Sequence, residues 1–173
     1  MEGTKSVKDC SRCEALTKTG IRCKARTCMG HLCWQHAMRD VGVRVLPSKI
    51  PNAGKGLFAV RDFKKGETVA MYHAGPCMTR DEFETKYPGD LLVEYGLCYG
   101  NQCSNPYKTN QKYARYANHQ RGSMRNADLV GKSCNTFRIK ATKNIKASRK
   151  DPMEVYVDYG NEYWKSSKES VSN

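Results

Sequence analysis

Cysteine and histidine residues near the N-terminus have the composition and spacing of a metal site. They read Cys13-x9-Cys23-x9-Cys33-x2-His36. Three thiolates and one imidazole are the ligand set of a closed, tetrahedral structural zinc site, which leaves no coordination position for a substrate. The cluster therefore predicts Zn²⁺ with a structural role, and Gly20 lets the chain turn back toward the metal. Three nearby side chains are alternative ligands: Cys10, Cys28 and His31.

A second set of residues suits the binding of a small, charged ligand. The stretch 115–127 reads RYANHQRGSMRNA and places Asn118 beside His119 in a basic run. Earlier in the chain, Gly54 and Gly56 bracket Lys55. Glycines let a backbone approach a ligand closely with its N–H groups turned toward it. A hairpin turn or a structural Asn–His pair would explain either feature alone, so the hypothesis depends on the blocks that accompany them.

Four blocks in a fixed order resemble those of the SET-domain lysine methyltransferases. The resemblance covers about residues 42–164. It is closest to the short SET proteins of large DNA viruses, which also end soon after a YGxxYW sequence, here YGNEYW at 159–164. The blocks are KGLFA at 55–59, KKGETVAMY at 64–72, RYANHQRGSMRNA at 115–127 and EVYVDYG at 154–160.

The resemblance implies S-adenosylmethionine as the cofactor and the side-chain amine of a lysine as the methyl acceptor. Trp164 follows the last block and either covers the adenine or belongs to the core. The residues that the matching blocks assign to cofactor binding are Lys55, Gly56, Leu57, Asn118 and His119.

The same resemblance assigns Tyr159 as the central active-site tyrosine and Tyr72 as a second wall of the lysine channel. For each, a buried core tyrosine is the alternative. Departures from the family pattern affect the loop geometry: Gln120 replaces a serine, Arg125 replaces a proline, and three extra residues separate Gln120 from Asn126. Val157 stands where the family often has an aromatic residue, so the number of methyl groups added stays open.

Charge bears on the partners. The 173-residue chain has a net charge of +13, which favours anionic partners such as nucleic acid. Acidic residues concentrate at 81–94, which holds five acids and one lysine. In the SET family this segment borders the peptide groove. An acidic groove on a basic body predicts a basic, lysine-containing protein substrate, a histone first of all, with nucleosomal DNA as a second partner. A solvated acidic helix face is the alternative.

Turn signals between short strand-like segments predict a mainly β fold. The resemblance implies that this is a SET-domain fold of small sheets, with a knot-like C-terminal crossing beside Asn118 and His119. We expect a zinc-binding segment at 1–40, a SET domain at 41–164 and a flexible tail at 165–173. Because the first two differ in composition, Cys33→Ser should unfold 10–40 but leave much of the SET core intact. A helix is expected over 78–89, and strands are expected within 41–46, 57–63, 68–74, 91–99, 136–145 and 153–160.

The sequence predicts an intracellular protein, nuclear if its substrate is chromatin. It has no apolar run of membrane-spanning length, and its N-terminus is polar without a signal sequence. For such a protein we expect reduced cysteines rather than disulfides, including Cys77, Cys98, Cys103 and Cys134. The oligomeric state stays open, with a homodimer as one candidate.

Two other functions compete with a histone lysine methyltransferase. One is a SET-like module without turnover that binds chromatin or nucleic acid. The other is a lysine methyltransferase whose substrate is not a histone. The presence of Tyr72, Asn118, His119 and Tyr159 favours an enzyme over a binding module.

Overall fold

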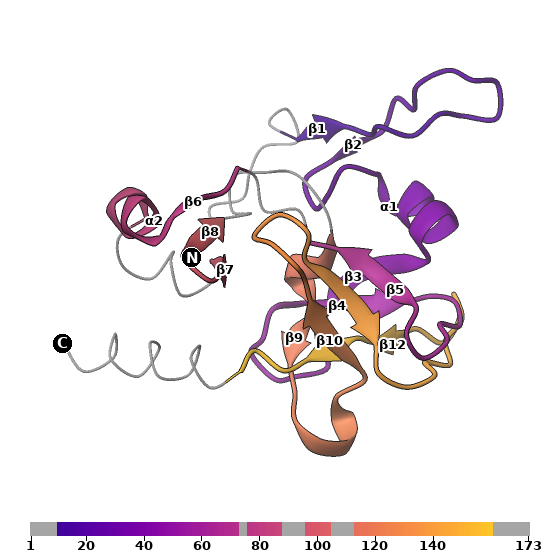
Figure 1. The fold of residues 1–173 in the computed structure, drawn as a ribbon. Helices are drawn as coiled ribbons and strands as arrows, with labels where there is room; N and C mark the ends of the chain where they lie inside the picture. The colour runs from indigo at the N-terminus through magenta and orange to yellow at the C-terminus, as the bar shows by residue number, and fades with distance from the viewer. Residues whose placement is uncertain (1–9, 73–75, 88–95, 105–112, 161–173) are drawn as a thin grey trace.

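The computed structural model describes residues 10–72, 76–87, 96–104 and 113–160. Within these ranges short strands form small sheets and the helices are brief, so the predicted mainly β architecture is confirmed (Figure 1). No helix of this part of the chain is long and apolar enough to cross a membrane. The expected tail at 165–173 lies outside the described residues.

Two three-stranded antiparallel sheets form the body of the molecule. In one, β4 (Lys55–Ala59) lies between β3 (Val43–Pro47) and β12 (Met153–Glu154). In the other, β11 (Arg138–Ala141) lies between β10 (Ala127–Val130) and β5 (Thr68–Met71). Of these strands, β5, β11 and β12 fall within the predicted segments, and β3 and β4 overlap theirs. The strand β10 was not predicted, because its side chains show no clear alternation.

A smaller unit lies beside the body and carries the acidic helix. It consists of β6 (Met78–Thr79), β7 (Leu97–Tyr99), β8 (Gln102–Ser104) and α2 (Arg80–Lys86). The predicted helix forms because Thr79 and Glu82 make a capping box at its start and Phe83 buries its ring on the inner side. The expected stop at Pro88–Gly89 lies outside the described residues.

The remaining elements are short. A two-stranded hairpin is formed by β1 (Ser11–Arg12) and β2 (Arg26–Thr27), and β9 (Asn118–His119) pairs with β13 (Tyr156–Val157). The loop between Gln120 and Asn126 contains the single turn η4 (Gly122–Met124). The other helical segments are α1 (Trp34–His36), η2 (Ala37–Val41) and η3 (Tyr113–Tyr116).

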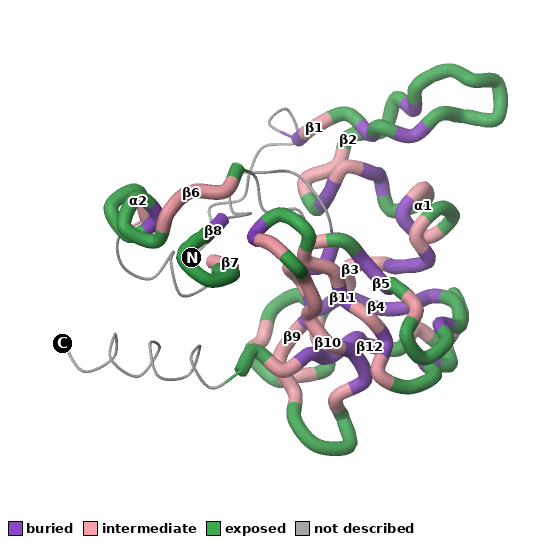
Figure 2. The backbone as a smooth tube through the Cα atoms, in the orientation of Figure 1, coloured by how far each residue is buried: buried purple, intermediate pink, exposed green. Residues whose placement is uncertain are grey.

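The N-terminal Cys/His segment and the SET part share one hydrophobic core. Cys13, Leu32 and Ala37 belong to the same buried cluster as Leu57 and Ile139. The Tyr113 hydroxyl of η3 accepts a hydrogen bond from the Leu32 N–H (3.2 Å) and donates one to the Leu32 carbonyl (2.6 Å). Figure 2 shows buried backbone running through both parts. This packing argues against the expectation that much of the SET core would stay intact when Cys33→Ser unfolds residues 10–40.

The structure contains three disulfides where free thiols were expected: Cys10–Cys28, Cys77–Cys134 and Cys98–Cys103. The reason is the tertiary structure, which brings together cysteines whose spacing in the sequence gives no sign of pairing. Cys98 and Cys103 are direct partners across the β7–β8 pair, and Cys10 and Cys28 flank the paired strands β1 and β2. Cys10 and Cys28 are therefore removed from the alternative metal ligands.

Candidate functional site

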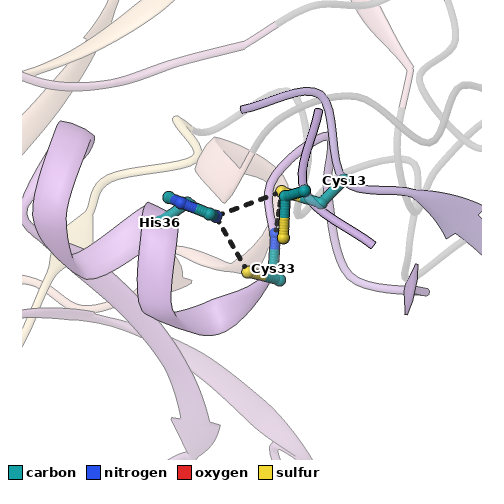
Figure 3. Close-up of side chains that lie close together, drawn as sticks. Cys13, Cys33 and His36 are labelled. Carbon is teal, nitrogen blue, oxygen red and sulfur yellow. Dashed lines mark hydrogen bonds between the residues drawn. The ribbon is translucent and has the colours of Figure 1, made fainter. Parts of the chain in front are cut away.

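The four predicted zinc ligands meet at one point. The Sγ atoms of Cys13, Cys23 and Cys33 and a ring nitrogen of His36 all lie within 4.8 Å of one another. The hairpin supplies two of the cysteines, and Cys33 precedes the short helix α1 that carries His36. The Nδ1 atom of His36 lies 3.5 Å from Cys13 Sγ and 3.2 Å from Cys33 Sγ (Figure 3). The alternative ligand His31 is not in this group and instead lies against the Tyr113 ring.

This donor set fits zinc. In a tetrahedral site with Zn–S of about 2.3 Å and Zn–N of about 2.0 Å, neighbouring ligand atoms lie roughly 3.5–3.8 Å apart, close to the spacing seen here. One imidazole nitrogen facing two sulfurs cannot donate a full hydrogen bond to both, but its lone pair can share a metal with them. The three cysteines are buried and His36 is partly buried, as a closed structural site requires.

Backbone groups support the thiolates from outside. The Cys33 N–H donates to Cys13 Sγ at 3.2 Å, and the Ala25 N–H donates to Cys23 Sγ at 3.5 Å. Burial opposes ionisation of Cys13, but the N–H donors outweigh it and lower the pKa of that thiol. Burial and the neighbouring Cys13 thiolate raise the pKa of Cys33. A cation among these sulfurs would remove this repulsion.

The Asn118–His119 stretch lies beside the last family block, as the resemblance implies. The two-residue strand β9 runs parallel to β13, with Asn118 opposite Tyr156 and His119 opposite Val157. The Gln120 N–H extends the pairing by donating to the Val157 carbonyl at 3.0 Å. Parallel pairing of segments so far apart in the chain brings Asn118, His119 and Tyr159 to one place. The knot-like threading itself stays a prediction.

Asn118 is held by a buried carboxylate that the sequence did not single out. Its Nδ2 lies 3.1 Å from the Lys55 carbonyl, 3.0 Å from Ser48 Oγ and 3.1 Å from Glu154 Oε1. Glu154 is fully buried, and its carboxylate also accepts from the Ser48 hydroxyl and the Lys49 N–H, both at 2.7 Å. The only sequence signal for this role was its place at the start of the EVYVDYG block.

Two further residues, Gly56 and Tyr156, lie directly against the Glu154 carboxylate. A Cβ at Gly56 would lie 2.2 Å from Glu154 Oε1, so no side chain fits there. Gly56 thus allows the Lys55 backbone to pass over the carboxylate. The Tyr156 hydroxyl donates to Glu154 Oε2 at 2.9 Å, and burial with this hydrogen bond raises the pKa of Tyr156 to about 12. Tyr156 therefore stays a donor at physiological pH.

His119 and Tyr159 hold each other. The Tyr159 backbone N–H donates to His119 Nδ1 at 3.1 Å, and the two ring centroids lie 5.4 Å apart. Burial lowers the pKa of His119, with Arg121 acting the same way and Asp158 opposing. A neutral imidazole that accepts at Nδ1 agrees with this direction. The Asp158 carboxylate lies farther from Nδ1, at 3.5 Å, and receives the Gly160 N–H at 2.9 Å instead. Asp158 is therefore not the main partner of Nδ1.

The Tyr159 hydroxyl reaches the chain just before Asn118. It donates to the Ala117 carbonyl at 2.9 Å, while the residue as a whole remains 36% exposed. Two oxygens thus lie side by side at the edge of the β9–β13 pair. Such a pair can orient an amine nitrogen, because both oxygens can accept from its N–H groups and leave its lone pair free to point toward an electrophile.

The other predicted site residues are placed as follows. Leu57 turns its side chain into the core, so only its backbone could contact a ligand; its carbonyl accepts from the Val155 N–H at 2.8 Å. Tyr72 follows β5 and packs against the core, and its N–H donates to the Phe137 carbonyl at 2.9 Å. Trp164 lies outside the described residues.

Comparison with known proteins identifies the family. Residues 54–160 match the SET domain family, so the chain belongs to it. Among solved structures, the methyltransferase domain of human PR domain-containing protein 2 aligns with a TM-score of 0.50 and 20% identity over 73% of this chain and 84% of that one.

A Plasmodium falciparum protein proposed to be a histone methyltransferase aligns with a TM-score of 0.49 and 22% identity, over 71% of this chain and 96% of its own. Identities this low establish a likeness of fold only. No curated protein matches the chain by sequence.

Proposed function

We propose that the protein transfers methyl groups from S-adenosylmethionine to lysine side chains of a protein substrate, with histones as the favoured class. The observation that carries the proposal is the parallel β9–β13 pair within a SET domain, which brings Asn118, His119 and Tyr159 together. Lysine methylation suits such a site because it needs alignment and exclusion of water more than acid or base groups.

The residues present suit the proposed cofactor. Asn118 and His119 would hold it together with the backbone at 55–57, since the Asn118 amide already lies on the Lys55 carbonyl. The neutral state of His119 fits a positively charged ligand, because an imidazolium would repel it. When bound, S-adenosylmethionine supplies an electrophilic methyl group. Glu154 and Gly56 keep the Asn118 amide and the Lys55 backbone in register for that ligand.

Tyr159 is the residue that we assign to the reaction itself. An incoming lysine must first lose its proton, although its pKa in water is about 10.4. A dry site beside a cation disfavours the ammonium form. The Ala117 carbonyl can then accept from the neutral amine, and the Tyr159 hydroxyl can fix the direction of its lone pair. Tyr72 would contribute a second wall of the channel.

Acidic side chains on α2 support a basic substrate. Asp81, Glu82 and Glu84 are all exposed on a seven-residue helix, whereas the chain as a whole has a net charge of +13. One local pair, Arg80–Glu84 at 4.0 Å, offsets part of this charge. A lysine-rich histone segment is complementary to such a surface.

Radiolabelled methyl transfer tests the proposal and separates it from the alternatives. The assay offers free histones, nucleosomes and a mixture of non-histone proteins. Label on histones supports the proposal as stated, and label only on other proteins would reassign the substrate. Absence of transfer in a folded protein would leave a SET-like binding module.

Calorimetry with S-adenosylmethionine tests the cofactor site separately. His119→Ala should weaken binding about tenfold or more, which is about 1.4 kcal/mol. Gln120→Ala is the matched control, because residue 120 contributes its backbone N–H to the same strand pair and keeps it in the variant. Equal affinity of wild-type protein and a folded His119→Ala variant would contradict the assignment.

A further inference from the structure

The base of the N-terminal hairpin is buried in the core, and its distal part stands away from the rest of the molecule (Figure 1). We call residues 11–27 the basic arm; its tip points outward at the upper right of Figure 1. The paired strands continue beyond β1 and β2 through hydrogen bonds from Cys13 N–H to Ala25 O and from Cys23 N–H to Ala15 O, both 2.8 Å. Gly20, with φ of +77°, closes the turn.

The two faces of the basic arm differ in chemistry. Side chains alternate between the faces of a hairpin. Cys13, Ala15 and Cys23 are buried on the face that holds the metal cluster. The residues that alternate with these are all exposed and form the opposite face, which we call the outer face. It carries four basic residues and one acidic residue, and consists of Arg12, Glu14, Leu16, Arg22, Lys24 and Arg26. Lys18 adds a further exposed base in the turn.

Like charges are held close together on this outer face. Arg12 and Arg26 are direct cross-strand partners, an arrangement that destabilises a hairpin. The Arg12 guanidinium donates to the carbonyls of Cys23 and Arg22, both at 2.9 Å. Arg22 donates in return to the carbonyls of Cys13 and Arg12, at 3.0 and 3.1 Å.

These contacts orient the guanidinium groups without neutralising them. Among the described residues, neither Arg12 nor Arg22 forms an ion pair with a carboxylate. The guanidinium groups of Arg12 and Arg22, held in place without a carboxylate partner in the part of the chain that the structure describes, fit an extended polyanion, whose charges would also offset the repulsion between Arg12 and Arg26.

We infer that the basic arm is a binding surface for double-stranded DNA. A two-stranded ribbon enters the major groove of B-form DNA, which is about 12 Å wide. The major groove of A-form RNA is deep and narrow and does not admit one. The basic side chains of the outer face would contact phosphates, so binding would be largely independent of the DNA sequence. This inference goes beyond the proposed methyl transfer and does not depend on it.

Fluorescence anisotropy with a short labelled DNA duplex tests the inference. Binding through about five phosphates, one for each basic residue of the outer face and one for Lys18, gives a slope of log K against log salt of roughly −4.5. The variant K18Q/K24Q should reduce the magnitude of that slope by about 2 and weaken binding about tenfold or more. Neither lysine side chain makes a hydrogen bond or ion pair within the described chain, so the fold and metal content should persist.

The matched control removes the same charge elsewhere. The variant K132Q/K150Q replaces two exposed lysines of the SET part and should retain wild-type affinity and slope. Equal weakening in both variants would mean that net charge, not the arm, attracts DNA, and would overturn the inference. Tighter binding of an RNA duplex of the same sequence, or full competition by poly-glutamate, would overturn the choice of partner. Because no S-adenosylmethionine is present, failure here leaves the methyl-transfer proposal untouched.

Discussion

Tyr159 is held at its backbone and at its hydroxyl by the two neighbours of Asn118, which are His119 and Ala117. Its backbone N–H donates to His119 Nδ1 and its hydroxyl to the Ala117 carbonyl. One aromatic side chain thereby spans the β9–β13 pair, yet keeps more than a third of its surface open. A purely structural tyrosine of this kind would be buried on all sides, as Tyr156 and Tyr113 are. The exposure of Tyr159 favours a role toward a ligand.

We expect Tyr159→Phe to slow methyl transfer far more than it destabilises the fold. Loss of one partly buried hydrogen bond should cost about 0.5–1.5 kcal/mol of the free energy of unfolding. Loss of a preorganised group at the reacting amine should lower the transfer rate roughly 10²-fold, or about 2.7 kcal/mol. Single-turnover methylation of a histone peptide at saturating S-adenosylmethionine measures the rate, and a melting curve of the same sample measures stability.

Tyr99→Phe provides the control for Tyr159→Phe. Tyr99 lies on β7 and is 52% exposed, so removal of its hydroxyl should change neither rate nor melting temperature. A Tyr159→Phe protein that melts earlier but turns over at the wild-type rate would show that the residue is structural. A change in the number of methyl groups at an unchanged rate would instead assign it to product specificity.

At the scale of elements, the sequence predicted those strands and helices that have a local pattern of their own. Strand-like segments between turn signals predicted β3, β5 and β11, and the helical pattern over 78–89 predicted α2. The two-residue strand β9 carries no periodicity of its own, and it forms only because β13 arrives beside it from far along the chain. Only the resemblance of both blocks to one family connected these segments in advance.

Buried polar groups show the same limit at the site. Glu154 reads as an ordinary strand residue, because a sequence does not reveal that donors from Ser48, Lys49, Asn118 and Tyr156 converge on it. The disulfides were missed for a related reason, since pairing depends on which strands lie together. The metal cluster was predictable because its thiol and imidazole ligands lie in one short segment, although only the structure separated Cys13, Cys23, Cys33 and His36 from the alternatives Cys10, Cys28 and His31.

Glu154 links three elements, and its substitution should act on Asn118. Glu154→Gln exchanges one acceptor oxygen for an N–H₂ group that faces donors, so it leaves donors unsatisfied in a buried place. We expect about 1–3 kcal/mol lower stability. We also expect about tenfold weaker S-adenosylmethionine binding, because the Asn118 amide loses its anchor. Calorimetry at a temperature where the variant is fully folded measures the affinity.

A destabilised core variant separates the two effects of Glu154→Gln. Ile139→Val removes one methylene from a fully buried position on β11 and should cost about 0.5–1.5 kcal/mol of stability. Its cofactor affinity should stay at the wild-type value. If both variants lose affinity in proportion to their loss of stability, Glu154 has no positioning role.

At the scale of the whole molecule, the metal cluster is part of the hydrophobic core. Cys13, Cys23 and Cys33 lie in the same buried cluster as the strands of the SET body. The Tyr113 hydroxyl is hydrogen-bonded to both polar backbone atoms of Leu32. Its ring packs so tightly on Gly30 that a Cβ there would lie 2.7 Å from the Tyr113 Cε1 atom. The N-terminal segment and the SET part should therefore unfold together, although they differ in composition.

Removal of the metal should accordingly lower the melting temperature of the entire chain. We expect about one zinc per chain by elemental analysis, and a chelator should shift a single unfolding transition downward. The cause is electrostatic as well as entropic, since the pKa values of Cys13 and Cys33 move in opposite directions and the metal-free pocket disfavours a second thiolate. Cys33→Ser should reproduce the shift without chelator.

Calorimetric melts with chelator, and with the same chelator presaturated with zinc, provide the measurement and its control. Two separate transitions, with the later one unmoved by the chelator, would show that the SET part folds independently of the Cys/His segment, and a protein that carries no metal would refute the site itself.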